Sequence, residues 1–264
     1  ESEIAHSVAY ATNASHPAKT ESHIDLNSQS FTIEMWIKYS SAGTILTHGT
    51  ADNKFVIAVD DNACLNITVN DKSMKSLKTL PKDKWTYLAV AVNQGSDFAT
   101  LSAVCAYDEF TDNLFVDETA PLYKGNGVIT VGEGLEAEIH ELTLWNYART
   151  SSESLSDIYL TKSPFTQGLI GYWKLNEGYG TIARDYVRNR HLIISGDNSW
   201  YLENENKALE IDGSNYVAMN VDHCPTNADD NYLIEFWFKG EKQNGVATLF
   251  NITAVNFITV IPIV

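Results

Sequence analysis

Apolar and polar side chains alternate along much of the chain with a period of two residues. The clearest case is 31–38, FTIEMWIK, in which every odd position from Phe31 to Ile37 is apolar. Because successive side chains of a β-strand point to opposite faces, this pattern predicts a strand with one buried face. Trp36 falls on the other, otherwise polar face, which marks it as an unusual position.

Similar alternating runs recur through the first half of the chain, and turns rich in Asp, Asn and Gly separate them. Such residues tolerate turn dihedrals and end strands. About seven strands at this spacing are typical of a β-sandwich. Besides 31–38, the pattern predicts a hairpin at 54–71 with its turn at 60–62, and strands at 83–95, 98–107, 127–134 and 138–148.

One segment departs from the strand pattern. The stretch 150–162, TSSESLSDIYLTK, places three apolar residues, beginning at Leu155, at the spacing i, i+3, i+4 of a helix face. Either Thr150 or Ser151 can cap its first turn, and Pro164 follows it. We therefore expect a single short helix here.

The chain also contains a long-range repeat. The stretch 30–38, SFTIEMWIK, returns as NYLIEFWFK at 231–239, separated by the length of a whole domain. Composition changes near Ser163, so we expect a first unit at 1–163 and a second at 164–264. The second unit stops before counterparts of the later strands. We expect either that the sequence is part of a longer protein or that the missing strands come from elsewhere.

Charge and hydropathy exclude several classes of partner. The 264 residues include 18 basic and 34 acidic side chains, a formal net charge of −16, and 44% hydrophobic residues. A globular protein of this charge is repelled by nucleic acid and by anionic membrane surfaces. The longest apolar stretch, 254–264, is too short to cross a bilayer. We expect no nucleic acid partner and no membrane insertion.

The cysteines leave two alternatives open. Their number is odd, and Cys64, Cys105 and Cys224 lack the spacing of a metal site. A Cys64–Cys105 disulfide would fit a secreted protein, whereas buried free thiols are common in any compartment.

Several segments resemble one known family. The stretch 168–200, GLIGYWKLNEGYGTIARDYVRNRHLIISGDNSW, resembles the opening segment of laminin-G-like, concanavalin A-like jelly-roll domains. The stretch 208–219 resembles the early strands of that family, 85–93 its central strand, and 137–155 its closing strand and short helix. The resemblance implies tandem all-β jelly rolls, each an antiparallel two-sheet sandwich, with the second incomplete.

The same fold occurs in glucanases, so the question is whether the sequence contains the acidic residues that a glucanase requires. Jelly-roll glucanases carry acidic residues at i, i+2 and i+4 of one strand, which supplies the two carboxylates of a retaining mechanism. At 210–214 the third position is Ser214, and at 138–142 the second and third are His140 and Leu142. Neither stretch completes the set, and we expect no enzyme activity.

Calcium is a further implication of the resemblance. Members of this fold class hold Ca²⁺ through an aspartate near the first strand, and an aspartate in the closing strand is also typical. Asp212 fits the first position in the second unit. The first unit has Ala11 and His140 at the two positions, which are not calcium ligands. We therefore expect a calcium site at Asp212 only.

Sugar binding would need aromatic rings that face solvent beside polar groups. Trp36, Tyr39, Tyr87 and Tyr147 are the candidates, with Trp36 foremost because of its place on the polar face. The alternative is that these rings pack the core, as most aromatic residues of a sandwich do.

These patterns favour a secreted or cell-surface module without catalytic activity, which binds a glycan or a glycosylated surface protein. Two alternatives remain: a structural or protein-adhesion repeat of a large surface protein, and an accessory domain of a polysaccharide-degrading enzyme or toxin. Nothing in the pattern indicates an oligomeric state.

Overall fold

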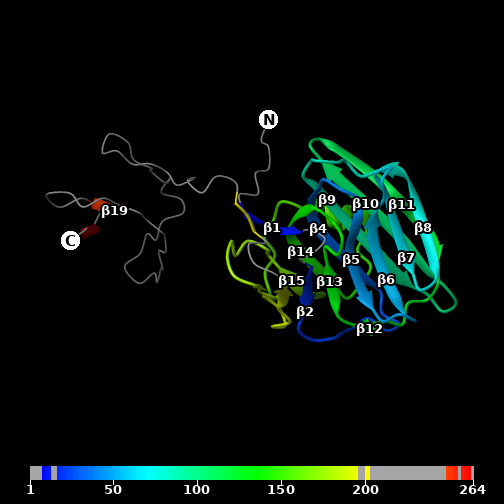
Figure 1. The fold of residues 1–264 in the computed structure, drawn as a ribbon. Helices are drawn as coiled ribbons and strands as arrows, with labels where there is room; N and C mark the ends of the chain where they lie inside the picture. Colours follow the sequence, from blue (N-terminus) through cyan, green and yellow to red (C-terminus); the bar gives the residue numbers. More distant parts are fainter. Residues whose placement is uncertain (1–7, 13–16, 196–199, 203–247, 255–256, 263–264) are drawn as a thin grey trace. The chain divides into compact units, whose positions relative to one another are not determined.

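The computed structural model describes residues 8–12, 17–195, 200–202, 248–254 and 257–262 (Figure 1). The chain divides into two compact units, Glu1–Lys207 and Ala208–Val264. In the second unit the described residues form one antiparallel hairpin of β19 (Thr248–Ala254) and β20 (Phe257–Pro262). All other described elements belong to the first unit.

Two antiparallel sheets build the first unit, which confirms the predicted all-β sandwich. In the first sheet the strand order is β11 (Phe110–Ala120), β10 (Ala99–Tyr107), β9 (Thr86–Gln94), β4 (Phe31–Tyr39), β14 (Ala137–Trp145), β1 (Val8–Thr12) and β18 (Trp200–Leu202). A further strand, β15 (Leu169–Trp173), pairs with the second half of β14.

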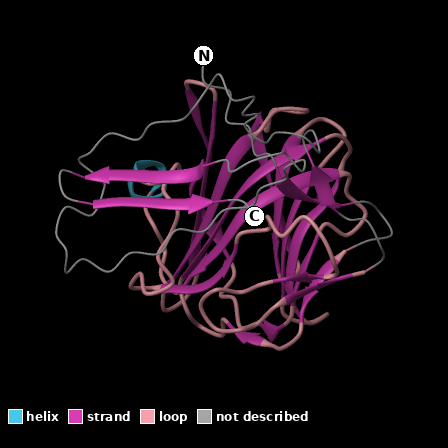
Figure 2. Ribbon diagram, turned by 90° about the vertical axis from the view of Figure 1, so that its left-hand side faces the viewer, coloured by secondary structure: helices cyan, strands magenta, loops and turns pink. Residues whose placement is uncertain are grey.

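The second sheet faces the first. Its order is β16 (Ile182–Ala183), β17 (Leu192–Ile194), β2 (Ala18–Thr20), β13 (Ile129–Val131), β5 (Gly43–Gly49), β6 (Lys54–Val59), β7 (Cys64–Val69) and β8 (Lys72–Thr79). A small ladder joins β3 (Ile24–Asp25) to β12 (Asn126–Gly127). In Figure 2 the strands lie in layers, and the one helix of the described residues lies outside them.

The core lies between the two sheets and is filled by the apolar half of each alternating strand. Phe31 of β4 meets Phe55 of β6 at 5.1 Å between ring centroids, and both contact Tyr123. Each such buried side chain contributes about 1.5–3 kcal/mol through apolar area removed from water. The alternation read from the sequence therefore identified the inner face of these strands correctly.

A buried histidine links the segments that carry Ile24 and Tyr123 to this core. His48 of β5 lies within 2.6 Å of the Tyr123 hydroxyl through Nδ1 and within 2.9 Å of the Ile24 carbonyl through Nε2. Burial lowers the pKa of His48 below its usual value. The neutral imidazole thus donates from Nε2 to Ile24 and accepts from Tyr123.

Helix α1 (Ser151–Ser156) begins where the sequence predicted and ends earlier. Thr150 is its N-cap: the hydroxyl accepts from the Glu153 N–H, and the Glu153 carboxylate accepts from the Thr150 N–H at 2.8 Å. This reciprocal pair satisfies two of the free donors at the helix start.

The segment after α1 completes the first sandwich in this structure. Strand β15 pairs with β14, β17 with β2, and β18 with β1, as the yellow-green part of the chain in Figure 1 shows. The expected boundary near Ser163 falls inside the compact unit Glu1–Lys207. The repeat at 231–239 lies outside the described residues, and the assignment of 164–264 to a second jelly roll stays a prediction.

Candidate functional site

Trp36 lies on the outer face of the first sheet, as its alternation predicted, but it is covered. Its indole packs against Tyr87 at 5.6 Å and Tyr159 at 6.0 Å between ring centroids, and its Nε1 donates to the Ile158 carbonyl. Trp36 and Tyr87 are each only 4% exposed. A sugar ring could stack on them only if the chain after α1 moved aside.

The other two aromatic candidates lie in different places. Tyr39 points into the core and its hydroxyl donates to the Leu80 carbonyl at 2.6 Å, and burial raises its pKa to about 12. Tyr147 is half-buried, with its ring edge-on to Trp145 at 6.0 Å. The structure therefore brings Trp36 and Tyr87 together but does not gather all four residues into one platform. Their role in ligand binding stays a prediction.

A hollow of about 420 Å³ opens at one end of the first sheet. It lies where β1 and β4 end and β14 begins, so that residues distant in the sequence share one wall. Tyr39 forms part of the lining, and the polar residues of the lining are Thr12, Lys38, Ser40, Asp83, Glu136 and Glu138. Its volume is within the range of roughly 300–1,000 Å³ that is usual for small-molecule sites.

Hydrogen bonds fix the shape of this hollow. The Thr12 hydroxyl accepts from the Ala137 N–H at 3.1 Å, and the Ser40 hydroxyl donates to the Glu136 carbonyl at 3.3 Å. Lys38 Nζ lies 3.5 Å from Glu138 Oε2, and both groups are partly exposed. The walls thus present an ammonium group, carboxylates and hydroxyls, which are the donors and acceptors that sugar hydroxyls need.

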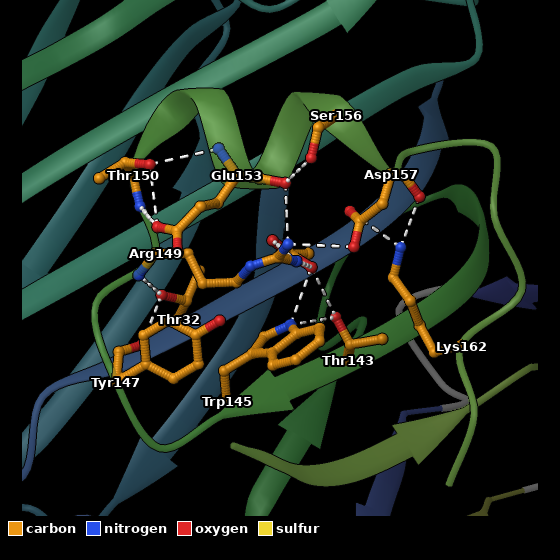
Figure 3. Close-up of polar contacts among 11 residues, drawn as sticks. Thr32, Thr143, Trp145, Tyr147, Arg149, Thr150, Glu153, Ser156, Asp157 and Lys162 are labelled. Atoms are coloured by element: carbon orange, nitrogen blue, oxygen red, sulfur yellow. Dashed lines mark hydrogen bonds and ion pairs between the residues drawn. The ribbon is translucent and has the colours of Figure 1, made fainter. Parts of the chain in front are cut away.

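A buried ionic network lies beneath α1 (Figure 3). Glu34 of β4 is 1% exposed, and its oxygens accept from Arg149 at 2.8 and 2.9 Å, from Trp145 Nε1 at 2.8 Å and from Thr143 at 3.1 Å. Arg149 also lies 4.2 Å from the Trp145 ring centroid. A charge buried so deeply is tolerated because the Arg149 guanidinium pairs with it and the Trp145 and Thr143 side chains also donate to it.

The same arginine holds the helix on the sheet. Its Nη2 donates to the Glu153 carbonyl at 2.8 Å and to Asp157 at 3.0 Å, and Lys162 lies 3.0 Å from the other Asp157 oxygen. Figure 3 shows Arg149 between the sheet and the end of α1. Glu34 and Asp157 are thus both engaged in structural contacts with Arg149, and Glu34 is shielded from solvent.

Sequence reasoning missed this network. Glu34 shares the outer face of β4 with Trp36, so alternation marked it as a solvent-facing residue. The signal that could have revealed it is the Trp36 position itself. A tryptophan on a polar face indicates that something covers that face, and a covered glutamate requires a cation such as Arg149.

Metal and membrane features are absent from the described part of the chain. No three His, Cys, Asp or Glu side chains gather there as a metal site would require. Asp212 lies outside the described residues. Cys64 and Cys105 are free thiols, and burial raises the pKa of Cys105 to about 11. Among the described residues, no helix is both long and apolar enough to cross a membrane.

The chain matches the model of one known protein family. Residues 12–153, more than half of the chain, match the family model of the concanavalin A-like lectin/glucanases superfamily. No curated protein matches the chain.

Solved structures are similar at low identity. A candidate carbohydrate-binding protein from Bacteroides ovatus ATCC 8483 is 16% identical with a TM-score of 0.53, over 74% of this chain and 60% of that one. A native heptameric SAP-like pentraxin from Limulus polyphemus is 13% identical with a TM-score of 0.39, over 73% of this chain and 95% of that one. The chain thus spans 60% of the length of the Bacteroides protein, and this similarity concerns the fold alone.

Proposed function

The chain belongs to the concanavalin A-like lectin/glucanases superfamily, and on this premise we propose that it is a non-catalytic module that recognises carbohydrate. The observation that carries the proposal is the polar hollow where β1 and β4 end and β14 begins, whose lining includes the charged side chains of Lys38, Asp83 and Glu138. A glycan, free or attached to a surface protein, is the partner that this chemistry fits. The proposal includes a secreted or cell-surface location.

The absence of catalysis is part of the proposal, because glucanases share the superfamily. It is supported by the incomplete acidic sets at 138–142 and 210–214 and by the structural use of Glu34 and Asp157. A tandem second jelly roll, supported by the repeat at 231–239, and a calcium ligand at Asp212 are also proposed. Fold similarity alone does not determine any of these properties.

A glycan array probed with this chain, with calcium and again with a chelator, tests the function. We expect a small set of neutral or acidic glycans to bind. Binding that disappears with the chelator would support the calcium site at Asp212. A blank array in both conditions would contradict carbohydrate recognition and favour a structural or protein-adhesion repeat.

A matched pair of variants then tests the hollow. Asp83→Asn preserves shape at a lining residue and should weaken glycan affinity by about tenfold, which corresponds to one lost charge-assisted hydrogen bond. Asp97→Asn removes the same charge from an exposed turn outside the hollow and should leave affinity unchanged. Equal effects of the two substitutions would show that the hollow is not the site. Release of reducing sugar from a bound glycan would contradict the non-catalytic reading.

A further inference from the structure

One stretch of the surface is basic although the chain as a whole is strongly acidic. The segment 174–191 carries four basic and two acidic side chains in a protein whose net charge is −16. Three of the four arginines of the whole chain are Arg184, Arg188 and Arg190. Such a local reversal of charge needs an explanation that the sandwich fold does not supply.

The turn that carries these arginines is held in place by a buried aspartate. Asp185 is 2% exposed, and its carboxylate accepts from the backbone N–H groups of Tyr172, Val187, Arg188 and Arg190. These hydrogen bonds compensate the negative charge of Asp185 within the turn. The side chains of Arg184, Tyr186 and Arg188 are all exposed, whereas Arg190 is half-buried and donates to the Ile170 carbonyl.

A lysine is held beside the exposed tyrosine of this turn. Lys174 Nζ lies 4.9 Å from the ring centroid of Tyr186, within the range of a cation–π contact. The backbone of Lys174 is fixed by Glu141, whose N–H donates to the Lys174 carbonyl at 3.0 Å. Glu141 lies at a bulge of β14 and has a left-handed φ of 54°. The Tyr172 hydroxyl donates to the Glu141 carboxylate, which secures the bulge.

The outward charges are not neutralised within the described part of the chain. The side chains of Lys174, Arg184 and Arg188 form none of the ion pairs found there. Two acidic side chains of this region have other partners: Glu141 is partly buried and bonded to Tyr172, and the Glu177 carboxylate accepts from the Arg184 backbone N–H at 2.8 Å.

We propose that Lys174, Arg184, Tyr186 and Arg188 form a second binding site, specific for an acidic polysaccharide that bears sulfate or carboxylate groups. Guanidinium groups form strong charge-assisted hydrogen bonds with such anions, often in pairs. The tyrosine ring is 40% exposed and offers an apolar surface to the sugar. The acidic remainder of the protein repels a polyanion and directs it to this patch.

The site is separate from the hollow, because none of its four residues lines it. It therefore does not rest on the proposed function of the hollow. The chain could bind acidic polymers here and leave the neutral glycans of the array unbound, or the reverse. The two proposals can thus fail independently.

Titration calorimetry with dextran sulfate, polygalacturonate and neutral dextran tests the site. We expect binding of at least one acidic polymer, none of neutral dextran, and weaker binding at higher salt. The double variant R184Q/R188Q should lose about tenfold or more in affinity, as expected for two lost charge-assisted contacts. The ratio of the affinities for dextran sulfate and polygalacturonate gives the preference for sulfate over carboxylate.

The control is K82Q/K124Q, which removes the same charge from exposed lysines elsewhere. It should leave affinity within about twofold, and an equal loss would show that net charge alone governs binding. Tyr186→Ala separates a saccharide site from a general polyanion site: it should weaken the polysaccharide but not inorganic polyphosphate. Failure of both acidic polymers to bind, or polysaccharide binding that is no tighter than polyphosphate binding and is unchanged by Tyr186→Ala, would overturn the proposal.

Discussion

At the scale of single residues, Glu34 and Arg149 show how a charge can be kept inside a β-sandwich. Three side chains donate to the carboxylate, and the guanidinium stacks on Trp145 while it reaches across to Asp157. The pair gives little net stability relative to an apolar core, but loss of one partner leaves the other charge buried. Stability should therefore fall most when a substitution removes only one partner of the pair.

Glu34→Ala should therefore lower the free energy of unfolding by roughly 3–5 kcal/mol, because Arg149 is left without its main counterion. Urea unfolding followed by tryptophan fluorescence measures the change. Lys84→Ala, which breaks an exposed ion pair with Asp108 at 2.8 Å, is the control and should have little effect. Equal and small effects of both substitutions would show that the buried network is not structurally important.

At the scale of elements, alternation identified the central strands of the first sheet well, but it missed β5 inside the second sheet and two edge strands. The strands β4, β9, β10 and β14 lie within about three residues of their predicted bounds. The strands β8 and β11 were not predicted. Each lies at the end of a sheet, where polar side chains are favoured because they discourage pairing with other chains. Edge strands therefore lack the pattern on which the prediction relied.

The helix start is an element-scale feature that can be tested directly. Thr150→Ala removes both the N-cap and half of the capping box, and should cost about 1 kcal/mol of stability. In this variant the Glu153 amide should exchange its hydrogen faster, because it loses the hydrogen bond that it donates to the Thr150 hydroxyl. Ser152→Ala, at an exposed position of the same helix, should be neutral or slightly stabilising. Identical behaviour of the two variants would argue against the capping role.

At the scale of the whole molecule, the segment after α1 is structurally part of the first sandwich. The strands β15, β17 and β18 extend the two sheets, and Trp173 and Leu192 lie in the main core. A boundary near Ser163 was predicted from a change of composition. Composition reports the local sequence, whereas the pairing of β15 with β14 depends on contacts that no local window contains.

Two truncated chains test whether the first unit ends near Ser163 or near Lys207. A chain that ends at Lys207 should unfold cooperatively, whereas one that ends at Ser163 should melt at lower temperature and aggregate more readily. The shorter chain exposes the edges of β14 and β2 and the core that Trp173 fills. Thermal unfolding and light scattering measure both effects. Equal stability of the two chains would support the boundary near Ser163 instead.

The sequence by itself determined the all-β class, the inner face of the central strands and a short helix capped at Thr150 or Ser151, since each follows from neighbouring residues. Only the tertiary structure decided that the outer face of β4 is covered and that Trp36 and Glu34 are buried. It also gathered Thr12, Lys38 and Glu136 around one hollow. The physical reason is the same in each case: alternation tells which face a side chain occupies, but contacts between distant segments decide what meets that face.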